Sequence, residues 1–367
     1  MANQLLRKTG LYLIGNLASK VTVALIVPIY AFFVQPDSLG VFDYDQTLML
    51  VLTPLAFFAL WESILRFAIN EGDERKLTEV VTTSVIMSCG SLLFVILLAV
   101  LIWSSLPYAR PYVLDVALMA SAYGMAQVWQ YLARGLRRPS EFVRSGVLAA
   151  LVNFAGILIL VCGLNMQLSG LVVSYVAGQL AVVVFLESRL RILKRLSFAD
   201  LDSALAKRML VFSAPLAINL ILISLITGFG RILITALLGP EQNGLYSFAM
   251  KFGGVVTAFG SIFSMAVVEE AILRIGKSEA DSFFRKVVRN TTELLIALSL
   301  IALPVISLFF LLIANTEYYP AFSLVPAFLV YAVATVLSTV VGSVFQAVEK
   351  TEQIALTSFL GTIATVV

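Results

Sequence analysis

Long apolar runs separated by short polar breaks extend along the whole of this 367-residue chain. Nearly all of them reach about 20 residues, the length that a helix needs to cross the ~30 Å hydrocarbon core of a bilayer. The pattern predicts an all-α, polytopic membrane protein. The runs begin near Gly10, Tyr44, Val80, Tyr112, Ser145, Leu168, Met209, Gly244, Asn290, Ala321 and Gln353.

The polar breaks alternate in charge. Of the 25 Lys and Arg residues, 21 lie before the first run or in the breaks after even-numbered runs. Since basic loops stay on the cytoplasmic side of a membrane, we expect a cytoplasmic N-terminus and cytoplasmic even-numbered breaks. The other breaks carry one base, Arg110, and the acids Asp37, Asp43, Asp115, Glu241 and Glu317. The remaining cations, Lys20, Arg231 and Lys251, fall inside predicted spans.

Composition supports this interpretation and excludes other classes of protein. Hydrophobic residues make up 60% of the chain and charged residues 13%, whereas about a quarter of a soluble domain is charged. The basic residues line a membrane surface, so no nucleic-acid partner is expected. Histidine is absent, and Cys89 and Cys162 lie in separate apolar runs, so we expect no metal, disulfide or cofactor.

The last run, residues 353–367, would be only about 22 Å long as a helix, which is too short to span. We interpret the chain as an incomplete copy of a longer protein. The alternative is a natural truncation with a re-entrant end.

Two distant stretches of the chain resemble each other. Pro36 to Phe42 (PDSLGVF) and Pro240 to Tyr246 (PEQNGLY) follow runs one and seven, and Glu62 to Arg66 (ESILR) and Glu270 to Arg274 (EAILR) end runs two and eight. Six runs separate the copies, an even number, so a parallel repeat is predicted. We therefore expect two pseudo-symmetric six-helix lobes, the second incomplete at its C-terminus. The predicted boundaries are an N-terminal lobe at 1–195, a cytoplasmic linker at 196–208 and a C-terminal lobe at 209–367.

These motifs, with ARGLRR at 133–138 between runs four and five, resemble those of bacterial polysaccharide and O-antigen flippases. This family belongs to the multidrug/oligosaccharidyl-lipid/polysaccharide exporter superfamily. The resemblance implies transport of a polyprenyl-pyrophosphate-linked glycan across the bacterial inner membrane, with membrane lipids and polysaccharide assembly proteins as further partners. The chain departs from relatives in two places: Gly230 precedes Arg231 where an Asp is frequent, and Ala31 to Phe33 lack the basic residue frequent there.

Cations inside the spans are the candidate substrate ligands. A charge at the bilayer centre costs about 2.5–3.5 kcal/mol, so Lys20, near the middle of run one, should face a wet cavity. Lys and Arg in such a cavity could neutralise a pyrophosphate. In the structural alternative, Arg231 and Lys251 snorkel outward or pair with Asp43 or Asp45. The candidate substrate-binding residues are Lys20, Asn16, Arg231, Lys251, Gln127 and Thr227.

A second candidate group lies at the inner ends of runs two and eight. Glu62 and Arg66, like Glu270 and Arg274, are spaced i,i+4. These pairs are either helix-end ion pairs worth a few tenths of a kcal/mol or a cytoplasmic gate shared by the lobes.

The expected function is alternating-access transport without covalent chemistry. The nearest rival is a drug or cation antiporter of the same superfamily, which would need intramembrane carboxylates, and run one has none. A membrane glycan polymerase or ligase is disfavoured because the outer breaks are short and histidine is absent. A non-transporting scaffold is a further alternative, but it would need no polar residues such as Thr227 and Arg231 along a predicted span.

Overall fold

The computed structural model describes residues 25–69, 71–107, 110–197, 201–254, 256–257 and 280–347. Within these ranges the regular secondary structure is helical and no β-strand occurs, which confirms the predicted all-α fold class. The chain divides into two compact units, Met1–Gly244 and Leu245–Val367.

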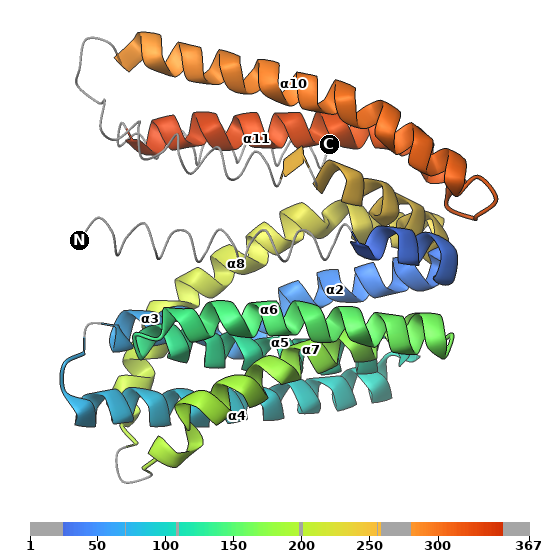
Figure 1. Ribbon diagram of the computed structural model, residues 1–367. Helices are drawn as coiled ribbons and strands as arrows, with labels where there is room; N and C mark the ends of the chain where they lie inside the picture. The colour runs from blue at the N-terminus through green and yellow to red at the C-terminus, as the bar shows by residue number, and fades with distance from the viewer. Residues whose placement is uncertain are drawn as a thin grey trace. The chain divides into compact units, whose positions relative to one another are not determined.

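The first unit is a bundle in which α4, α5 and α6 lie side by side (Figure 1). After a helix at residues 25–33, its elements are α2 (Pro36–Phe57), α3 (Leu60–Ala68), α4 (Glu74–Ser105), α5 (Arg110–Gly135), α6 (Pro139–Gly156), the π-helical η2 (Ile157–Gly163), α7 (Gln167–Leu190), the 3-10 turn η3 (Leu193–Arg195) and α8 (Ser203–Leu238). Because α8 packs on α2, α3 and α4, this compact unit extends beyond residue 195. The lobe boundaries stay a prediction.

The described residues of the second unit include two long helices. These are α10 (Ala280–Leu312) and α11 (Val325–Ala347), joined through the 3-10 helix η5 (Tyr319–Leu324). A further helix, residues 240–254, starts before Gly244 and continues into this unit. Its Phe248 packs on Tyr318, with ring centroids 4.4 Å apart, so aromatic side chains form the core between these elements.

Among the described residues, six helices are long and apolar enough to cross a membrane, and the bent pair α2 and α3 makes a seventh if it counts as one span. This confirms a multi-pass membrane protein. The six are Glu74–Ser105, Pro139–Gly163, Gln167–Leu190, Ser203–Leu238, Arg285–Leu312 and Tyr319–Val341. Large apolar side chains on α4, such as Leu97 and Leu101, are more than half exposed, as lipid-facing residues would be.

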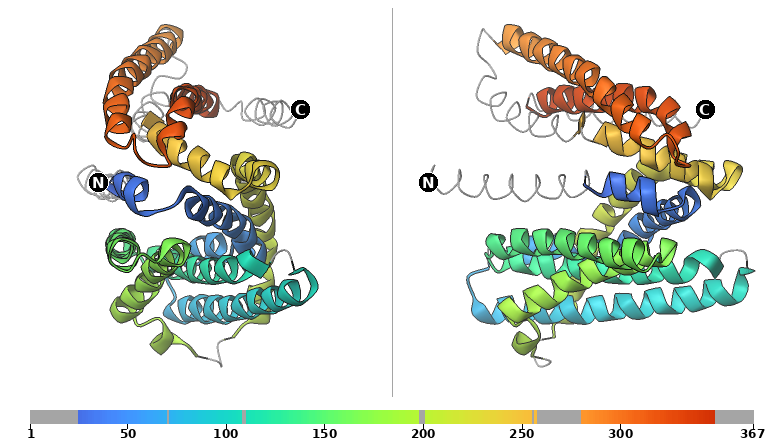
Figure 2. Two further views of the ribbon diagram at one scale, coloured as in Figure 1. Left: turned by 90° about the vertical axis from the view of Figure 1, so that its right-hand side faces the viewer. Right: turned by 45° about the vertical axis from the view of Figure 1, so that its right-hand side comes forward.

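The run that begins near Tyr112 forms α5, but α5 is too polar to be counted among these six. The reason is its place in the bundle. It contacts α2, α3, α4, α6 and α7, and it lies between α4 on one side and α6 and α7 on the other (Figure 2). Met119 and Leu132 are fully buried. A helix enclosed by other helices needs no continuous lipid-facing surface and can carry polar side chains.

Helix directions in the first unit follow the predicted alternation. Tyr44 of α2 packs on Tyr112 of α5, and Phe57 lies against Gly124, so α2 and α5 run in the same direction. Along α8 the contacts with α2 and α3 come in the reverse order, so α8 runs in the opposite direction. Thr47 lies against Gly228, whereas Phe67 packs on Phe212 with ring centroids 6.1 Å apart.

Helix α2 begins earlier than expected. The sequence pattern placed Asp43 and Asp115 in outer breaks, and this is wrong, because α2 starts at Pro36 and α5 at Arg110. Proline fits the first turn of a helix, whose N–H groups have no partner within the helix. Both carboxylates therefore lie on helices inside the bundle.

Helix α2 is separated from α3 by a sharp break. Phe58 and Ala59 both adopt left-handed conformations, with φ of 49° and 47°, and the two helices differ in direction by 53°. Pro54 has no N–H to donate, and its carbonyl accepts the N–H of Ala59 across an enlarged turn. The break divides the span into a segment that carries Asp43 and a segment that carries Glu62.

Candidate functional site

Arg231 forms an ion pair with Asp43. The guanidinium Nε lies 2.8 Å from a carboxylate oxygen, and the two side chains are 21% and 12% exposed. Asp43 is seven residues after the start of α2, and Arg231 is seven residues before the end of α8. At 1.5 Å per residue, both lie about 10 Å along their helices from the same end of the bundle. Of the alternatives for Arg231, pairing with Asp43 is the one that the structure contains.

Thr227 lies one turn before Arg231 on α8 and is exposed. Its hydroxyl donates a 2.9 Å hydrogen bond to the carbonyl oxygen of Ile223 in its own helix. That bond occupies the hydroxyl proton but leaves the oxygen able to accept. Gly228, the next residue, lets the side chain of Thr47 approach α8 closely, so this part of α8 is pressed against α2.

Gln127 lies on α5 and is engaged with its own helix. Its amide Nε2 donates a 2.6 Å hydrogen bond to the hydroxyl of Tyr123. One turn further, Gln130 donates to the hydroxyl of Ser145 on α6. This face of α5 therefore carries hydroxyl and amide groups in the interior of the bundle.

At the opposite end of the bundle, Glu62 contacts α5. The hydroxyl of Tyr131 donates a 3.0 Å hydrogen bond to Glu62, and the guanidinium of Arg134 lies 4.8 Å from the centroid of the Tyr131 ring. Arg66 is exposed, and the described part of the chain contains no ion pair between Glu62 and Arg66. Glu62 thus fastens α3 to α5 through Tyr131.

The other predicted site residues are distributed as follows. Lys251 is half-buried on the helix at residues 240–254, in the second unit. Lys20, Asn16, Glu270 and Arg274 lie outside the described residues. The structure thus puts Arg231 and Thr227 together on α8, with Gln127 on α5.

Sequence reasoning missed one functional candidate, Asp45. This residue is fully buried, and neither carboxylate oxygen has a hydrogen-bond partner among the described residues. Asp115 lies on α5, the helix that packs beside α2. The available signal was an acidic residue nine positions after the start of a membrane helix. This signal was missed because the neighbouring Asp43 was assigned to a loop.

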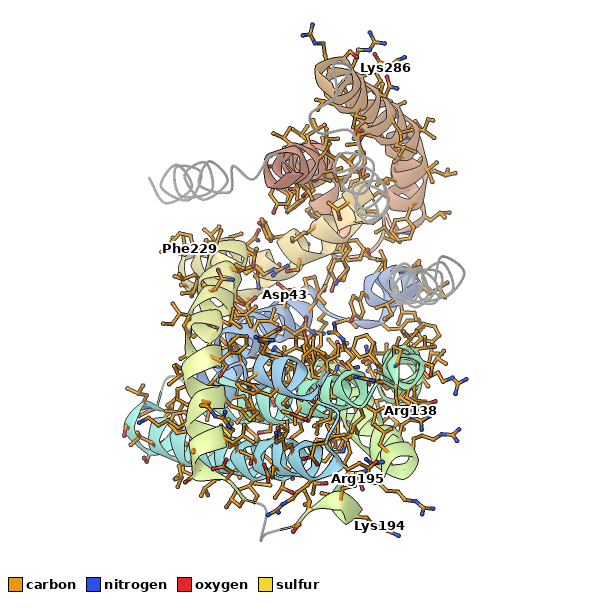
Figure 3. All side chains as sticks on the ribbon, turned by 90° about the vertical axis from the view of Figure 1, so that its left-hand side faces the viewer. Asp43, Arg138, Lys194, Arg195, Phe229 and Lys286 are labelled. Atoms are coloured by element: carbon orange, nitrogen blue, oxygen red, sulfur yellow. The ribbon has the colours of Figure 1, made fainter. Side chains whose placement is uncertain are left out.

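Figure 3 looks onto the end of the first unit that carries Arg138, Lys194 and Arg195. Arg138 is exposed, as is Lys194. The ion pair of Asp43 and Arg231 is near the other end. Within the first unit the clustered cations and the intramembrane ion pair are therefore well separated.

Comparison with known proteins identifies the fold. The structure resembles the inward-facing conformation of a multidrug resistance MATE family transporter of the MOP superfamily, with 15% identity, a TM-score of 0.67 and coverage of 96% of this chain and 88% of that one. An outward-facing conformation of such a transporter matches with 13% identity, a TM-score of 0.57 and coverage of 97% and 86%. A MATE in the straight conformation matches with 14% identity, a TM-score of 0.57 and coverage of 98% and 85%.

A comparison with curated protein sequences finds no significant match. The family described as "Polysaccharide biosynthesis protein", in contrast, matches residues 5–268, more than half of the chain. Together with the fold, this match supports membrane transport within the MOP superfamily. The chain belongs to the polysaccharide biosynthesis protein family, and its fold is that of the MATE transporters.

Proposed function

We propose that the protein carries a lipid-linked oligosaccharide, a polysaccharide precursor on polyprenyl pyrophosphate, across the bacterial inner membrane. The N-terminus is cytoplasmic in this proposal, and the lipid tail stays in the bilayer while the polar head crosses by alternating access. The observation that carries the proposal is Arg231, a guanidinium held about 10 Å inside the bundle by the carboxylate of Asp43.

A pyrophosphate can compete with Asp43 for Arg231. Guanidinium groups bind carboxylates and phosphates with the same planar pairs of donors, and a pyrophosphate carries more charge than a single carboxylate. Asp43 therefore acts as a substitute for the substrate: it keeps Arg231 neutralised and oriented while the site is empty. The bond is broken only when a more strongly charged anion arrives.

The sugars require different ligands. The hydroxyl oxygen of Thr227, an exposed residue, and the amide of Gln127 can exchange hydrogen bonds with hydroxyl groups, and half-buried Tyr123 offers an aromatic face. Lys20 and Lys251 would add positive charge, as their positions in predicted spans indicate. No step forms or breaks a covalent bond.

A drug or cation antiporter is the second candidate. The observation in its favour is that Asp43, Asp45 and Asp115 lie on helices inside the bundle, so intramembrane carboxylates are present. A cationic drug would bind to such carboxylates directly. The two candidates differ in the charge of their substrate: Arg231 attracts an anionic pyrophosphate and repels a cationic drug.

The test is transport in proteoliposomes that contain the full-length protein. A fluorescent oligosaccharide on polyprenyl pyrophosphate is the first probe, and a fluorescent organic cation is the second. We expect Arg231→Ala to reduce glycan transport by about tenfold or more and Arg231→Lys to retain part of it, because charge survives without the planar donor geometry. Arg138→Ala, the control, removes an exposed arginine and should leave the rate unchanged.

Transport of the organic cation by the unaltered protein, together with no transport of the glycan, would overturn the proposal in favour of the antiporter. Glycan transport that survives Arg231→Ala at normal protein abundance would remove Arg231 from the site.

A further inference from the structure

A pocket of about 260 Å³ lies at the end of the first unit where α4 begins. Pockets for drug-sized ligands are about 300–1,000 Å³, so this one suits a smaller polar group. Residues of α4 and one residue of η3 line it: Glu74, Leu77, Thr78, Val81 and Arg195.

Two charges of opposite sign line this pocket, and neither is used by the fold. Glu74 and Arg195 are exposed, and neither side chain forms an ion pair or a hydrogen bond with any described residue. Neighbouring carboxylates, in contrast, are engaged. Asp73 accepts the N–H of Arg75 at 2.9 Å, and Glu79 lies 3.7 Å from the guanidinium of Arg75. The pocket therefore offers a ligand one carboxylate and one guanidinium.

The segment that carries Arg195 is fastened to the bundle on both sides. Before it, the N–H of Leu193 donates a 3.1 Å hydrogen bond to the carboxylate of Glu187 on α7. After it, the N–H of Ser197 donates a 3.2 Å hydrogen bond to the hydroxyl oxygen of Thr82 on α4. These bonds hold η3 beside α4, so the pocket is built into the folded unit.

The pocket lies at the depth of lipid headgroups. Helix α4 has 32 residues, about 48 Å at 1.5 Å per residue, whereas the hydrocarbon core of a bilayer is about 30 Å thick. The charged first turn of α4, with Glu74, Arg75 and Lys76, therefore lies outside the hydrocarbon, at the surface predicted to be cytoplasmic.

The lining changes from charged to apolar along the helix. Leu77 lies about 5 Å and Val81 about 10 Å further along α4 than Glu74, in the direction of the hydrocarbon. A ligand that fits this order has its charged part at the membrane surface and its apolar part towards the bilayer interior. A phospholipid has that arrangement.

We propose that this pocket binds the headgroup of phosphatidylethanolamine from the surrounding membrane leaflet. The guanidinium of Arg195 binds the phosphate, and the carboxylate of Glu74 accepts hydrogen bonds from the ammonium group. Leu77 and Val81 contact the glycerol and the first carbons of the acyl chains. One headgroup thus satisfies both charges of the pocket.

Other common phospholipids match the pocket less well. The ammonium of phosphatidylcholine carries methyl groups in place of N–H donors, so it cannot donate hydrogen bonds to Glu74. Phosphatidylglycerol has no positive charge, and its phosphate would meet Arg195 with Glu74 left unpaired. Discrimination between lipids therefore depends on Glu74, whereas binding of any phosphate depends on Arg195.

The bound lipid would connect two parts of the chain. Glu74 belongs to α4, and Arg195 precedes the segment that leads to α8. A lipid held by both residues joins α4 to this connection. The site lies at the end of the bundle opposite the ion pair of Asp43 and Arg231, and its binding can be measured with no glycan present.

The test is native mass spectrometry of the full-length protein released from detergent micelles. The protein is titrated separately with phosphatidylethanolamine, phosphatidylcholine and phosphatidylglycerol that carry identical acyl chains. The unaltered protein should bind phosphatidylethanolamine about tenfold more tightly than either of the others. Glu74→Gln should lower this affinity about tenfold, to that of phosphatidylcholine. Arg195→Gln should weaken the binding of all three lipids.

Lys194→Gln is the matched control, because it removes an exposed cation next to Arg195 that does not line the pocket. It should leave the affinity for phosphatidylethanolamine unchanged. Thermal unfolding without added lipid should be the same for all three variants, since each replaces an exposed side chain, and this separates lost binding from misfolding.

Three results would overturn the proposal. The first is equal affinity of the unaltered protein for the three lipids, and the second is a preference for phosphatidylethanolamine that survives Glu74→Gln. The third is tightest binding of phosphatidylglycerol, weakened equally by Arg195→Gln and Lys194→Gln, which would indicate a general basic surface. Glycerophosphoethanolamine, the same headgroup without acyl chains, should not displace the lipid at equal concentration. Displacement by it would refute the assignment to a membrane lipid.

Discussion

Gly40 and Gly244 stand in a reciprocal relationship. A Cβ added to Gly40 would fall on the carbonyl oxygen of Pro240, and a Cβ added to Gly244 would fall on the carbonyl oxygen of Pro36. Each glycine thus packs against the proline that begins the other's motif. The amide of Asn243 adds a 2.8 Å hydrogen bond to the carbonyl of Gly40. Reciprocal contact between matched positions is what a two-fold relation produces, so it supports the internal repeat.

Substitution of either glycine tests this contact. Gly40→Ala and Gly244→Ala should each lower the free energy of unfolding by about 1–3 kcal/mol, because the added methyl meets backbone that cannot rotate away. Thermal unfolding of the purified protein measures the loss. Gly90→Ala is the control, since a Cβ at this exposed helical position meets nothing within 4 Å. Equal stability of all three variants would show that the two helical segments that begin at Pro36 and Pro240 are not in contact.

The ion pair of Asp43 and Arg231 gives a second prediction. Asp43→Asn leaves a largely buried guanidinium without its counterion, so stability should fall by about 1–3 kcal/mol. The same variant should bind a pyrophosphate-linked lipid more tightly, because the competing carboxylate is gone. Thermal unfolding with and without the lipid measures both effects. Weaker binding of the lipid by Asp43→Asn would contradict the idea that Asp43 substitutes for the substrate.

A double-mutant cycle separates the pair from its surroundings. Asp43→Asn combined with Arg231→Gln should cost less than the sum of the single changes, because the second substitution removes the charge that the first leaves unpaired. Strict additivity would mean that the 2.8 Å contact contributes little to stability.

Most of the fold could be predicted from apolar runs and charge. Alternation of basic breaks fixed the relative directions of α2, α5 and α8, and the contacts Tyr44–Tyr112 and Thr47–Gly228 agree with them. A run of about 20 apolar residues has few alternatives to a membrane helix, so this part of the problem depends on local sequence alone.

The site was harder to predict, because polar residues near span ends look the same whether they lie in a loop or in a helix. Asp43 and Asp115 were placed in breaks on the basis of charge, although Pro36 and Arg110 already begin helices. Whether an aspartate meets an arginine, as Asp43 does, or meets no donor within the described part of the chain, as Asp45 does, depends on the rotation of neighbouring helices. Hydropathy carries no information about that rotation.

The break between α2 and α3 gives a third prediction. Ala59 has a φ of 47°, where a Cβ is unfavourable and glycine is not. Ala59→Gly should therefore keep or raise stability, by up to about 1 kcal/mol. Ala56→Gly is the matched control: it lies in the regular part of α2, is equally buried, and should lose about 1 kcal/mol. If both variants lose the same amount, Ala59 does not occupy the left-handed conformation.

The charge pattern gives a fourth prediction, on the orientation of the protein. Arg137 and Arg195 should face the cytoplasm, and Glu241 and Glu317 the outer side. Single cysteines at these positions, in a chain that lacks Cys89 and Cys162, can be labelled from one side of sealed vesicles. Cysteines at Arg137 and Glu241 should react from opposite sides. Labelling of both from the same side would refute the alternating topology.

Lys20, which lies outside the described residues, gives the last prediction. A cation near the middle of a membrane span costs about 2.5–3.5 kcal/mol, so we expect its side chain to face the wet interior where a pyrophosphate passes. Lys20→Ala should abolish glycan export by the full-length protein while its abundance stays near normal, because loss of a solvated cation does not disturb packing. Lys20→Arg should retain part of the export, since charge is kept and donor geometry changes. Full export by Lys20→Ala at normal abundance would leave Arg231 as the main intramembrane cation available to the substrate. Loss of the folded protein in that variant would instead assign Lys20 a structural role.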